Sequence, residues 1–119
     1  MPILKCKRKK TEHIIQKSIV RWFRKEYPEY LLFSTNNEAC YNNNYYLESG
    51  VLSGVSDLIV VLPNKIIFVE LKAERGIQSK SQKEFETKLI SLGYEYFLIR
   101  SLESFKELIM SILEIKKNA

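Results

Sequence analysis

Two apolar runs separated by only a short segment constrain the fold of this chain more than any other feature. The segments DLIVVL and KIIFVELK are separated by Pro63 and Asn64. Runs of this length and composition predict β-strands, and the Pro-Asn pair predicts a turn between them. We therefore expect a β-hairpin whose first strand begins with Asp57 and whose second ends with Glu70 and Lys72.

The other elements follow from helical spacing and from start and stop signals. These predict a helix over residues 12–26 capped by Thr11, a strand at 30–34, a long loop at 35–54, a helix from Ser79 that ends at Gly93, a strand at 94–100 and a terminal helix at 101–117. The order is α-β-β-β-α-β-α. Strands that are apolar on both faces, with helices before and after them, predict an α/β fold with a mixed central sheet flanked by helices.

The bulk composition favours one basic domain. With 119 residues and 45% hydrophobic content, residues 1–119 suffice for a single core, preceded by a basic tail at 1–10. The net charge of +5 favours a polyanionic partner such as nucleic acid or an anionic membrane surface. Cys6 and Cys40 form no disulfide or zinc pattern. Because the basic start is not followed by a continuous apolar segment long enough for a signal peptide or a membrane span, we expect a soluble cytoplasmic protein that enters no membrane.

The register of the hairpin decides whether its two acids meet. With the turn centred between Pro63 and Asn64, Leu62 pairs with Lys65. Counting back then places the acid at 57 opposite the acid at 70. A four-residue loop is favoured, because Pro63 cannot take the first central position of a primed two-residue turn, and both loops give this pairing. A three-residue loop would shift the pairing by one residue.

Opposed carboxylates repel one another unless something offsets the repulsion, and a bound cation would do so. Carboxylate oxygens suit a hard divalent ion such as Mg²⁺. Strand alternation puts Lys72 on the same side as Glu70. Helical spacing places Glu12 in the core-facing stripe of the first helix and Gln82 in that of the second. Four polar side chains and one lysine are therefore predicted to converge.

Each of these residues also has a purely structural interpretation. Asp57 could be a turn residue, and Glu12 is favoured in a first helical turn by the helix dipole. Gln82 could complete a capping box with Ser79. The charged end of the second strand could simply enter solvent. The conjunction of all four on converging faces favours a functional site over four separate accidents.

The pattern resembles a known nuclease family. An acid at the start of one strand and Glu-x-Lys at the end of the next resembles the PD-(D/E)XK signature, although Ser56 replaces its proline. More closely, the segment SGVSDLIVVLPNKIIFVELKAERGIQSKSQKEFETKLISLGYEYFLIRSLESF resembles the VRR-NUC family, the virus-type replication-repair nucleases. The matching features are Gly54-x-x-Asp57, Glu70-x-Lys72, Gly76, Ser79 or Ser81, Gln82 and Gly93, with Glu12 and Gln16 in the first helix.

The resemblance implies a restriction-endonuclease-like core and hydrolysis of DNA phosphodiesters with Mg²⁺ or Mn²⁺. It implies a homodimeric endonuclease acting on branched DNA, including four-way (Holliday) junctions, in phage or bacterial replication, recombination or repair. It places the protein in the cytoplasm of a bacterium or of a phage-infected host cell.

The resemblance also implies roles for single residues. The metal ligands would be Asp57, Glu70, the Leu71 carbonyl and Glu12, the last directly or through water. Lys72 would orient or activate the attacking water and stabilise developing negative charge. We favour the electrostatic role, because lysine ammonium groups are ordinarily protonated at neutral pH. Gln82 would position the water or a phosphate oxygen.

Basic residues near this site are candidates for contacts with the DNA backbone. Arg75, Lys80 and Ser79 are close to it in sequence, and the tail adds Lys9 and Lys10, although most such runs are solvated. Three tyrosines of the 35–54 loop could stack on exposed bases or pin the loop. The terminal helix is broadly apolar over 108–115, which suggests a dimer surface.

Two other functions remain open from the sequence. One is a non-catalytic DNA-binding or assembly module with the nuclease fold, which the intact acids and lysine disfavour. The other is a restriction-type duplex nuclease, for which 119 residues leave little room beyond the loop.

Overall fold

The predicted hairpin lies at the centre of the structure, a computed structural model in which residues 10–35, 50 and 52–117 are described. Strands β2 (Leu58–Leu62) and β3 (Lys65–Leu71) pair antiparallel, with Leu62 opposite Lys65 and Val61 opposite Ile66. The predicted register is therefore confirmed.

The turn between these strands differs from the prediction. It is a two-residue loop rather than a four-residue one, because β2 ends at Leu62 and β3 begins at Lys65. Asn64 has a φ of 57°. Proline followed by a residue with positive φ is the sequence pattern of a type II turn. The prediction was wrong because it weighed only primed turns, in which proline does not fit the first position.

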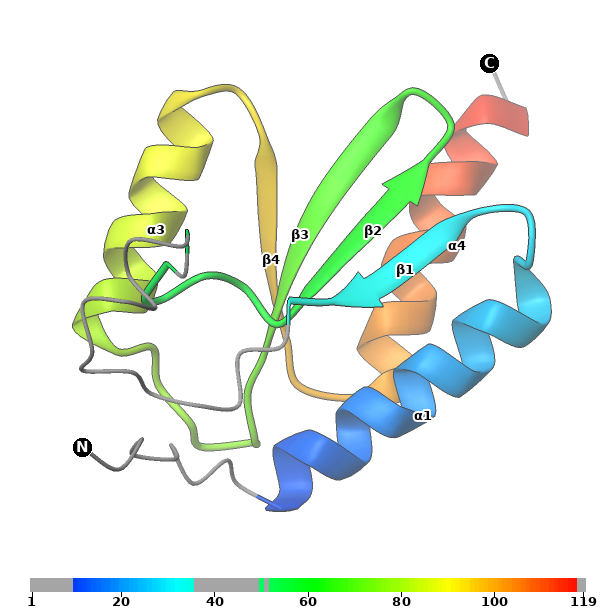
Figure 1. Ribbon diagram of the computed structural model, residues 1–119. Helices are drawn as coiled ribbons and strands as arrows, with labels where there is room; N and C mark the ends of the chain where they lie inside the picture. Colours follow the sequence, from blue (N-terminus) through cyan, green and yellow to red (C-terminus); the bar gives the residue numbers. More distant parts are fainter. Residues whose placement is uncertain (1–9, 36–49, 51, 118–119) are drawn as a thin grey trace.

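The hairpin is extended on both sides into a mixed sheet of order β1-β2-β3-β4. Strand β1 (Leu31–Ser34) pairs antiparallel with β2, and β4 (Glu95–Ile99) pairs parallel with β3 (Figure 1). The long loop joins β1 to β2, and the two-residue turn joins β2 to β3. Strands β3 and β4 are parallel, so they are connected by a crossover that contains α3.

Helices cover the sheet on both sides, as predicted. Helices α1 (Lys10–Glu26) and α4 (Leu102–Lys117) lie on one side, and α3 (Lys80–Ser91) lies on the other (Figure 1). The element order α-β-β-β-α-β-α is confirmed. The cap assigned to Thr11 was wrong, since the first helix already begins at Lys10 and Thr11 lies in its first turn.

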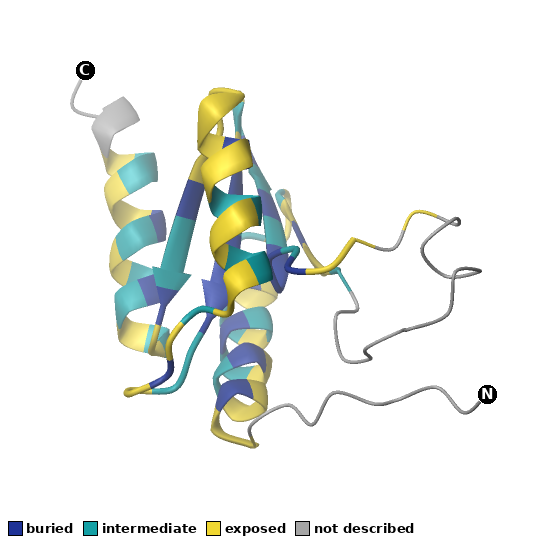
Figure 2. Cartoon of the chain, turned by 90° about the vertical axis from the view of Figure 1, so that its left-hand side faces the viewer, coloured by how far each residue is buried: buried dark blue, intermediate teal, exposed yellow. Residues whose placement is uncertain are grey.

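The main core forms between the sheet and the α1–α4 pair, and Figure 2 shows buried positions on the strands and on α1. Alternate residues of β2 and β3 face this layer, and the buried cluster comprises Ile19, Phe23, Leu32, Leu58, Val60, Leu62, Ile67, Val69, Leu71, Ile99, Phe105 and Ile109. Phe105 of α4 packs against Trp22 of α1 with ring centroids 6.0 Å apart. Leu108, Ile112 and Leu113 pack against the same core. These three residues are partly buried against the chain's own core, and the expected dimer surface on α4 stays a prediction.

The opposite face of the sheet is covered less completely. Phe68 of β3 packs against Phe85 of α3, with ring centroids 6.2 Å apart. Away from α3, Leu31 and Phe33 of β1 and Ile66 of β3 are exposed. Leu31 and Ile66 align with Val61 beside the hairpin turn, whereas Glu70 lies on the same face at the other end of β3.

Several predictions concern residues that lie outside the described part of the chain. These are the basic tail up to Lys9, both cysteines, and the part of the 35–54 loop that carries Tyr41, Tyr45 and Tyr46. Among the described residues, no helix combines the length and the apolarity that a membrane crossing requires.

Candidate functional site

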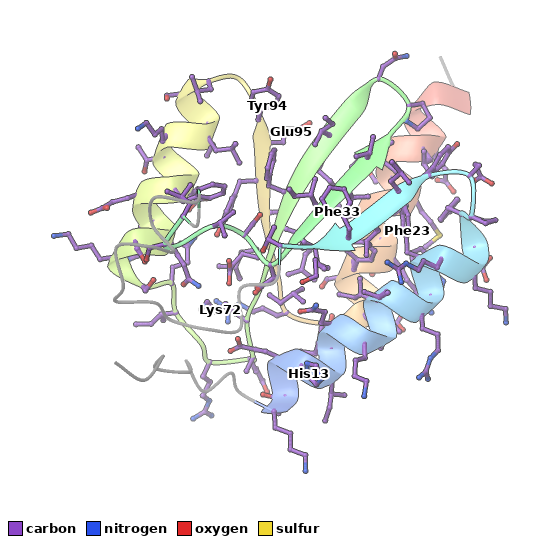
Figure 3. All side chains as sticks on the ribbon, viewed as in Figure 1. His13, Phe23, Phe33, Lys72, Tyr94 and Glu95 are labelled. Atoms are coloured by element: carbon purple, nitrogen blue, oxygen red, sulfur yellow. The ribbon has the colours of Figure 1, made fainter. Side chains whose placement is uncertain are left out.

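One end of the sheet gathers most of the predicted functional residues. The N-terminal end of β2 and the C-terminal end of β3 meet there, close to the first turns of α1 and α3. In Figure 3, Lys72 lies in the space between α3 and α1, at the opposite end of the sheet from Tyr94 and Glu95. His13 lies on α1 and is exposed.

Asp57 joins the ends of the two central strands. Its side chain is buried, and Oδ2 accepts a hydrogen bond from the backbone N–H of Leu71 at 2.7 Å. Because Leu58 pairs with Val69, one further step of the same register places Asp57 opposite Glu70. At the end of the strand pair, the Asp57 carboxylate accepts from a β3 backbone N–H in place of a β2 carbonyl. The end of the sheet therefore fixes the position of this carboxylate.

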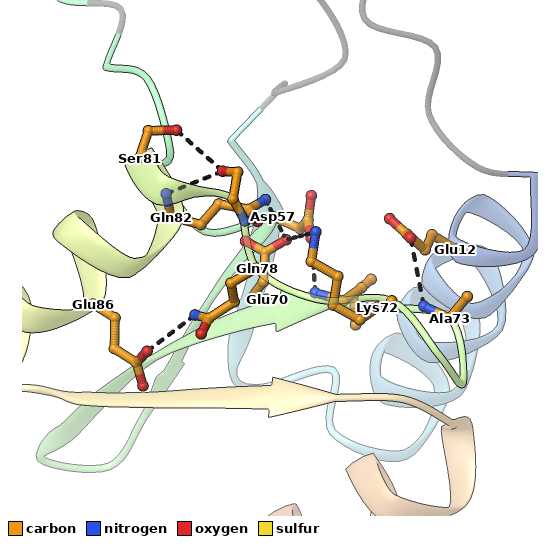
Figure 4. A network of polar contacts seen from close by, with 12 residues as sticks. Glu12, Asp57, Glu70, Lys72, Ala73, Gln78, Ser81, Gln82 and Glu86 are labelled. Atoms are coloured by element: carbon orange, nitrogen blue, oxygen red, sulfur yellow. Dashed lines mark hydrogen bonds and ion pairs between the residues drawn. The ribbon is translucent and has the colours of Figure 1, made fainter.

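Glu70 is the most deeply buried acid of the site, with 1% of its surface exposed. Its Oε2 accepts a hydrogen bond from Nε2 of Gln82 at 3.1 Å and lies 3.9 Å from Nζ of Lys72 (Figure 4). The Lys72 side chain is itself 12% exposed. The structure therefore brings Glu70, Lys72 and Gln82 together on the α3 face, as the strand and helix periods predicted.

Gln82 serves the helix and the site at once. Its Oε1 accepts from the backbone N–H of Ser79 at 2.8 Å, and its own backbone N–H donates to the Ser79 hydroxyl at 3.2 Å, which completes a capping box. Because the capping box uses the amide oxygen, the amide nitrogen is left to donate to Glu70. The structural and functional interpretations of Gln82 are thus compatible, since the cap sets the direction of the amide.

Gly54 explains how the chain can pass so close to this helix. It has a φ of +83°, and a Cβ built there would collide with the backbone carbonyl of Ser81 and lie 2.8 Å from the backbone nitrogen of Gln82. Only glycine tolerates both the left-handed conformation and this approach. The Gly-x-x-Asp spacing therefore brings the strand entry against the first turn of α3.

Glu12 and Gln16 reach the same end of the sheet from α1. Oε2 of Glu12 accepts from the backbone N–H of Ala73 at 3.5 Å, one residue beyond Lys72. Gln16 lies one turn later and is buried, and its Oε1 has no hydrogen-bond partner among the described residues. Glu12 thus borders the site next to Lys72, and its contact is with the β3–α3 loop.

Sequence reasoning missed a second polar network beside the first. Nε2 of Gln78 donates to Oε1 of Glu86 at 3.0 Å and contacts the Tyr96 hydroxyl at 3.2 Å. Burial raises the pKa of Tyr96, and the charge of Glu70 raises it further. No spacing in the sequence indicated this network, because its three members come from a loop, a helix and a strand.

The residues proposed for DNA contact are accessible where they are described. Arg75, Ser79 and Lys80 are exposed around the β3–α3 loop, and Lys10 is exposed at the start of α1. Arg75, Ser79 and Lys80 are thus accessible on the chain between Lys72 and Gln82. Their positions permit contact with a long anionic ligand.

The donor chemistry of the site fits a hard divalent cation. Asp57 and Glu70 supply two neighbouring carboxylates, and Mg²⁺ is commonly held by one or two carboxylates with water in its other positions. Within residues 10–35, 50 and 52–117, no group of three or more Asp, Glu, His or Cys side chains is close enough to hold a metal ion. A bound ion would therefore use the two strand carboxylates, with further ligands from backbone or water.

Comparisons with known proteins agree with this fold. No family model matches the chain, and no curated protein matches it. A solved structure described as a VRR_NUC domain protein is similar, with a TM-score of 0.70 and 17% identity over 88% of this chain and 89% of that one. Another, described as a VRR_NUC domain, has a TM-score of 0.62 and 26% identity over 83% of this chain and 94% of that one. These likenesses, together with the strand-end acids, support the assignment of this chain to the VRR-NUC family, with its restriction-endonuclease-like fold.

Proposed function

We propose that this protein is a divalent-metal-dependent DNA endonuclease that hydrolyses phosphodiester bonds, with a preference for branched DNA such as four-way junctions. The likeness to VRR_NUC domains supports a nuclease of the PD-(D/E)XK type. The observation that carries the proposal is the buried Glu70 carboxylate, with Lys72 at 3.9 Å and Gln82 at 3.1 Å, beside Asp57 at the adjoining strand end. A purely structural strand end has no need of this arrangement.

Each residue of the site has a separate role in the proposed hydrolysis. A Mg²⁺ or Mn²⁺ ion held by Asp57 and Glu70, with the Leu71 carbonyl as a further candidate ligand and Glu12 reaching it through water, would supply Lewis-acid charge to the phosphate. Lys72 presents a positive charge where negative charge develops as water attacks phosphorus and the ester P–O bond breaks. Gln82 holds the Glu70 carboxylate in one orientation. Arg75, Lys80, Ser79 and Lys10 would hold the phosphates of the flanking backbone.

We further propose that the enzyme acts as a homodimer. A four-way junction has two strands to cut symmetrically, and a two-fold dimer presents two equivalent sites. Light scattering at working concentration tests this proposal, and a monomeric mass on the bound junction would contradict it.

A cleavage assay tests the catalytic proposal directly. Labelled four-way junction, flap and linear duplex are incubated with the wild-type protein in Mg²⁺, Mn²⁺ or EDTA, beside Asp57→Asn and Lys72→Ala. Asparagine retains an oxygen that can accept from the Leu71 N–H, so Asp57→Asn should fold while losing the charge that holds a cation.

We expect cleavage that needs the metal and is lost in both variants. Full activity in both variants, or no cleavage of any substrate, would refute the catalytic proposal and favour a DNA-binding module. Equal cleavage of duplex and junction would retain the chemistry and remove the preference for branched DNA.

A further inference from the structure

The loop between β3 and α3 carries functional residues at both of its ends. Lys72 begins it, and Ser79 ends it at the cap that orients Gln82. Within it, the backbone N–H of Gly76 donates to the carbonyl of Ala73 at 2.9 Å. This single turn does not explain how the loop is held against the rest of the protein.

Arg100 provides that attachment. It follows β4 directly, and the backbone N–H of Lys72 donates to the Ile99 carbonyl at 3.0 Å, which brings the end of β4 alongside the loop. Three loop carbonyl oxygens accept from its Nη1, those of Ala73 at 2.7 Å, Glu74 at 3.2 Å and Gly76 at 2.8 Å. Nη1 carries two hydrogens, so the three carbonyls share them, and the planar guanidinium holds this nitrogen more rigidly than a flexible lysine stem holds its ammonium.

The curvature of the loop matters because two site residues rest on it. A Cβ built on Gly76 would lie 3.3 Å from Cδ of Lys72, so the backbone at Gly76 borders the lysine stem. The N–H of Ala73, whose carbonyl Arg100 binds, faces Oε2 of Glu12. A change in the loop would therefore move the support of Lys72 and the contact of Glu12 together.

We propose that Arg100 is a positioning residue that sets the orientation of Lys72 and Glu12 through the loop carbonyls at 73, 74 and 76, without contacting DNA. The part that concerns cleavage rests on the proposed nuclease function. The part that concerns the loop rests on the hydrogen bonds alone and can be measured separately.

The test compares Arg100→Ala and Arg100→Lys with Arg24→Ala. Arg24 is a matched control, because its Nη2 donates to one backbone carbonyl, that of Leu32 in β1, at 3.1 Å. Hydrogen exchange of the backbone amides of residues 72–79 measures how firmly the β3–α3 loop is held. Steady-state cleavage of the substrate that the wild type cuts best gives kcat and KM.

For both Arg100 variants we expect faster exchange from 72 to 79, and a kcat lower by about 10- to 100-fold with little change in KM, the size typical of lost support behind catalytic groups. Guanidinium ion at a non-denaturing concentration should restore part of the kcat of Arg100→Ala. Arg24→Ala should leave loop exchange and kcat unchanged.

Two results would overturn the inference. Wild-type exchange and kcat in Arg100→Lys would show that charge alone suffices. A raised KM with unchanged kcat and exchange would make Arg100 a DNA contact instead. If the wild-type protein cleaves no DNA, the proposed function fails, and loop exchange in Arg100→Ala still decides the positioning role.

Discussion

The side-chain amide of Gln82 donates to Oε2 of Glu70 at 3.1 Å, while the oxygen of the same amide accepts from the backbone of Ser79 at 2.8 Å. A helix cap thereby orients a buried carboxylate on the neighbouring strand. Helix α3 thus does more than cover the sheet, because its first turn forms one wall of the site.

This relationship predicts that Gln82→Glu impairs cleavage even though the helix cap persists. Glutamate retains an oxygen for the Ser79 N–H, so the capping box persists. It also replaces the donor to Glu70 with an acceptor and adds a like charge. We expect cleavage to fall by about 10- to 100-fold, with a loss of unfolding free energy of about 1–3 kcal/mol from the lost hydrogen bond to the Glu70 carboxylate.

The matched control is the N-cap of α4, where Ser101 Oγ accepts from the backbone N–H of Ser104 at 3.1 Å. Ser101→Ala should cost about 0.5–2 kcal/mol and leave cleavage unchanged. Urea unfolding and the junction assay measure both quantities. Wild-type cleavage by Gln82→Glu would show that the amide has no part in orienting Glu70.

Lys72→Ala should abolish cleavage and yet strengthen the response to Mg²⁺. The ammonium lies 3.9 Å from Oε2 of Glu70, so it shields that carboxylate when no cation is bound. Its removal weakens the compensation of the repulsion between Glu70 and Asp57, at a cost of about 1–3 kcal/mol. A bound cation then relieves more strain in the variant than in the wild type.

Thermal unfolding with and without Mg²⁺ measures this effect. A ligand at one hundred times its Kd stabilises a protein by about 2.7 kcal/mol, and we expect the gain to be larger in Lys72→Ala than in the wild type. Asp57→Asn should show little or no gain. A smaller gain in Lys72→Ala than in the wild type would mean that the lysine helps to hold the metal.

The raised pKa of Tyr96 predicts that the unfolding free energy falls at high pH. Burial, and then the charge of Glu70, raise the pKa of Tyr96 above its ordinary value of 10.0. A raised folded-state pKa favours the neutral hydroxyl, so this stabilisation is complete below about pH 10 and is lost as the pH rises towards the folded value. The unfolding free energy of the wild type should fall faster above pH 10 than that of Tyr96→Phe, by at most about 1.4 kcal/mol per pH unit.

Urea unfolding between neutral pH and pH 11 measures this difference. At neutral pH, Tyr96→Phe should cost about 0.5–1.5 kcal/mol, since the hydroxyl contacts Gln78 at 3.2 Å. Burial raises the pKa of Tyr27 as well, and that contribution is common to both proteins. Parallel pH profiles for the two proteins would contradict the assignment.

The sequence predicted those parts of the site that follow from strand and helix periods. The pairing of Leu62 with Lys65 fixed the meeting of the strand-end acids, and period-2 alternation placed Lys72 with Glu70. It did not predict Arg100, because three backbone carbonyls at 73, 74 and 76 leave no trace in side-chain patterns. The length of the Pro63-Asn64 turn was wrongly predicted because Asn64 takes a positive φ, which allows a type II turn. Two-residue hairpin loops more commonly have type I′ or II′ turns.

Gly54→Ala should damage the site more than a glycine change of equal backbone strain elsewhere. Gly54 and Gly93 have φ values of +83° and +94°, but a Cβ on Gly93 meets nothing within 4 Å, whereas one on Gly54 collides with the Ser81 carbonyl. Both substitutions should lose about 1–2 kcal/mol from the left-handed conformation. Gly54→Ala should lose about 1–3 kcal/mol more from the collision, and cleavage with it, because the first turn of α3 must move Gln82 away from Glu70. Equal unfolding free energies and equal cleavage rates for the two variants would show that the close approach at Gly54 does not shape the site.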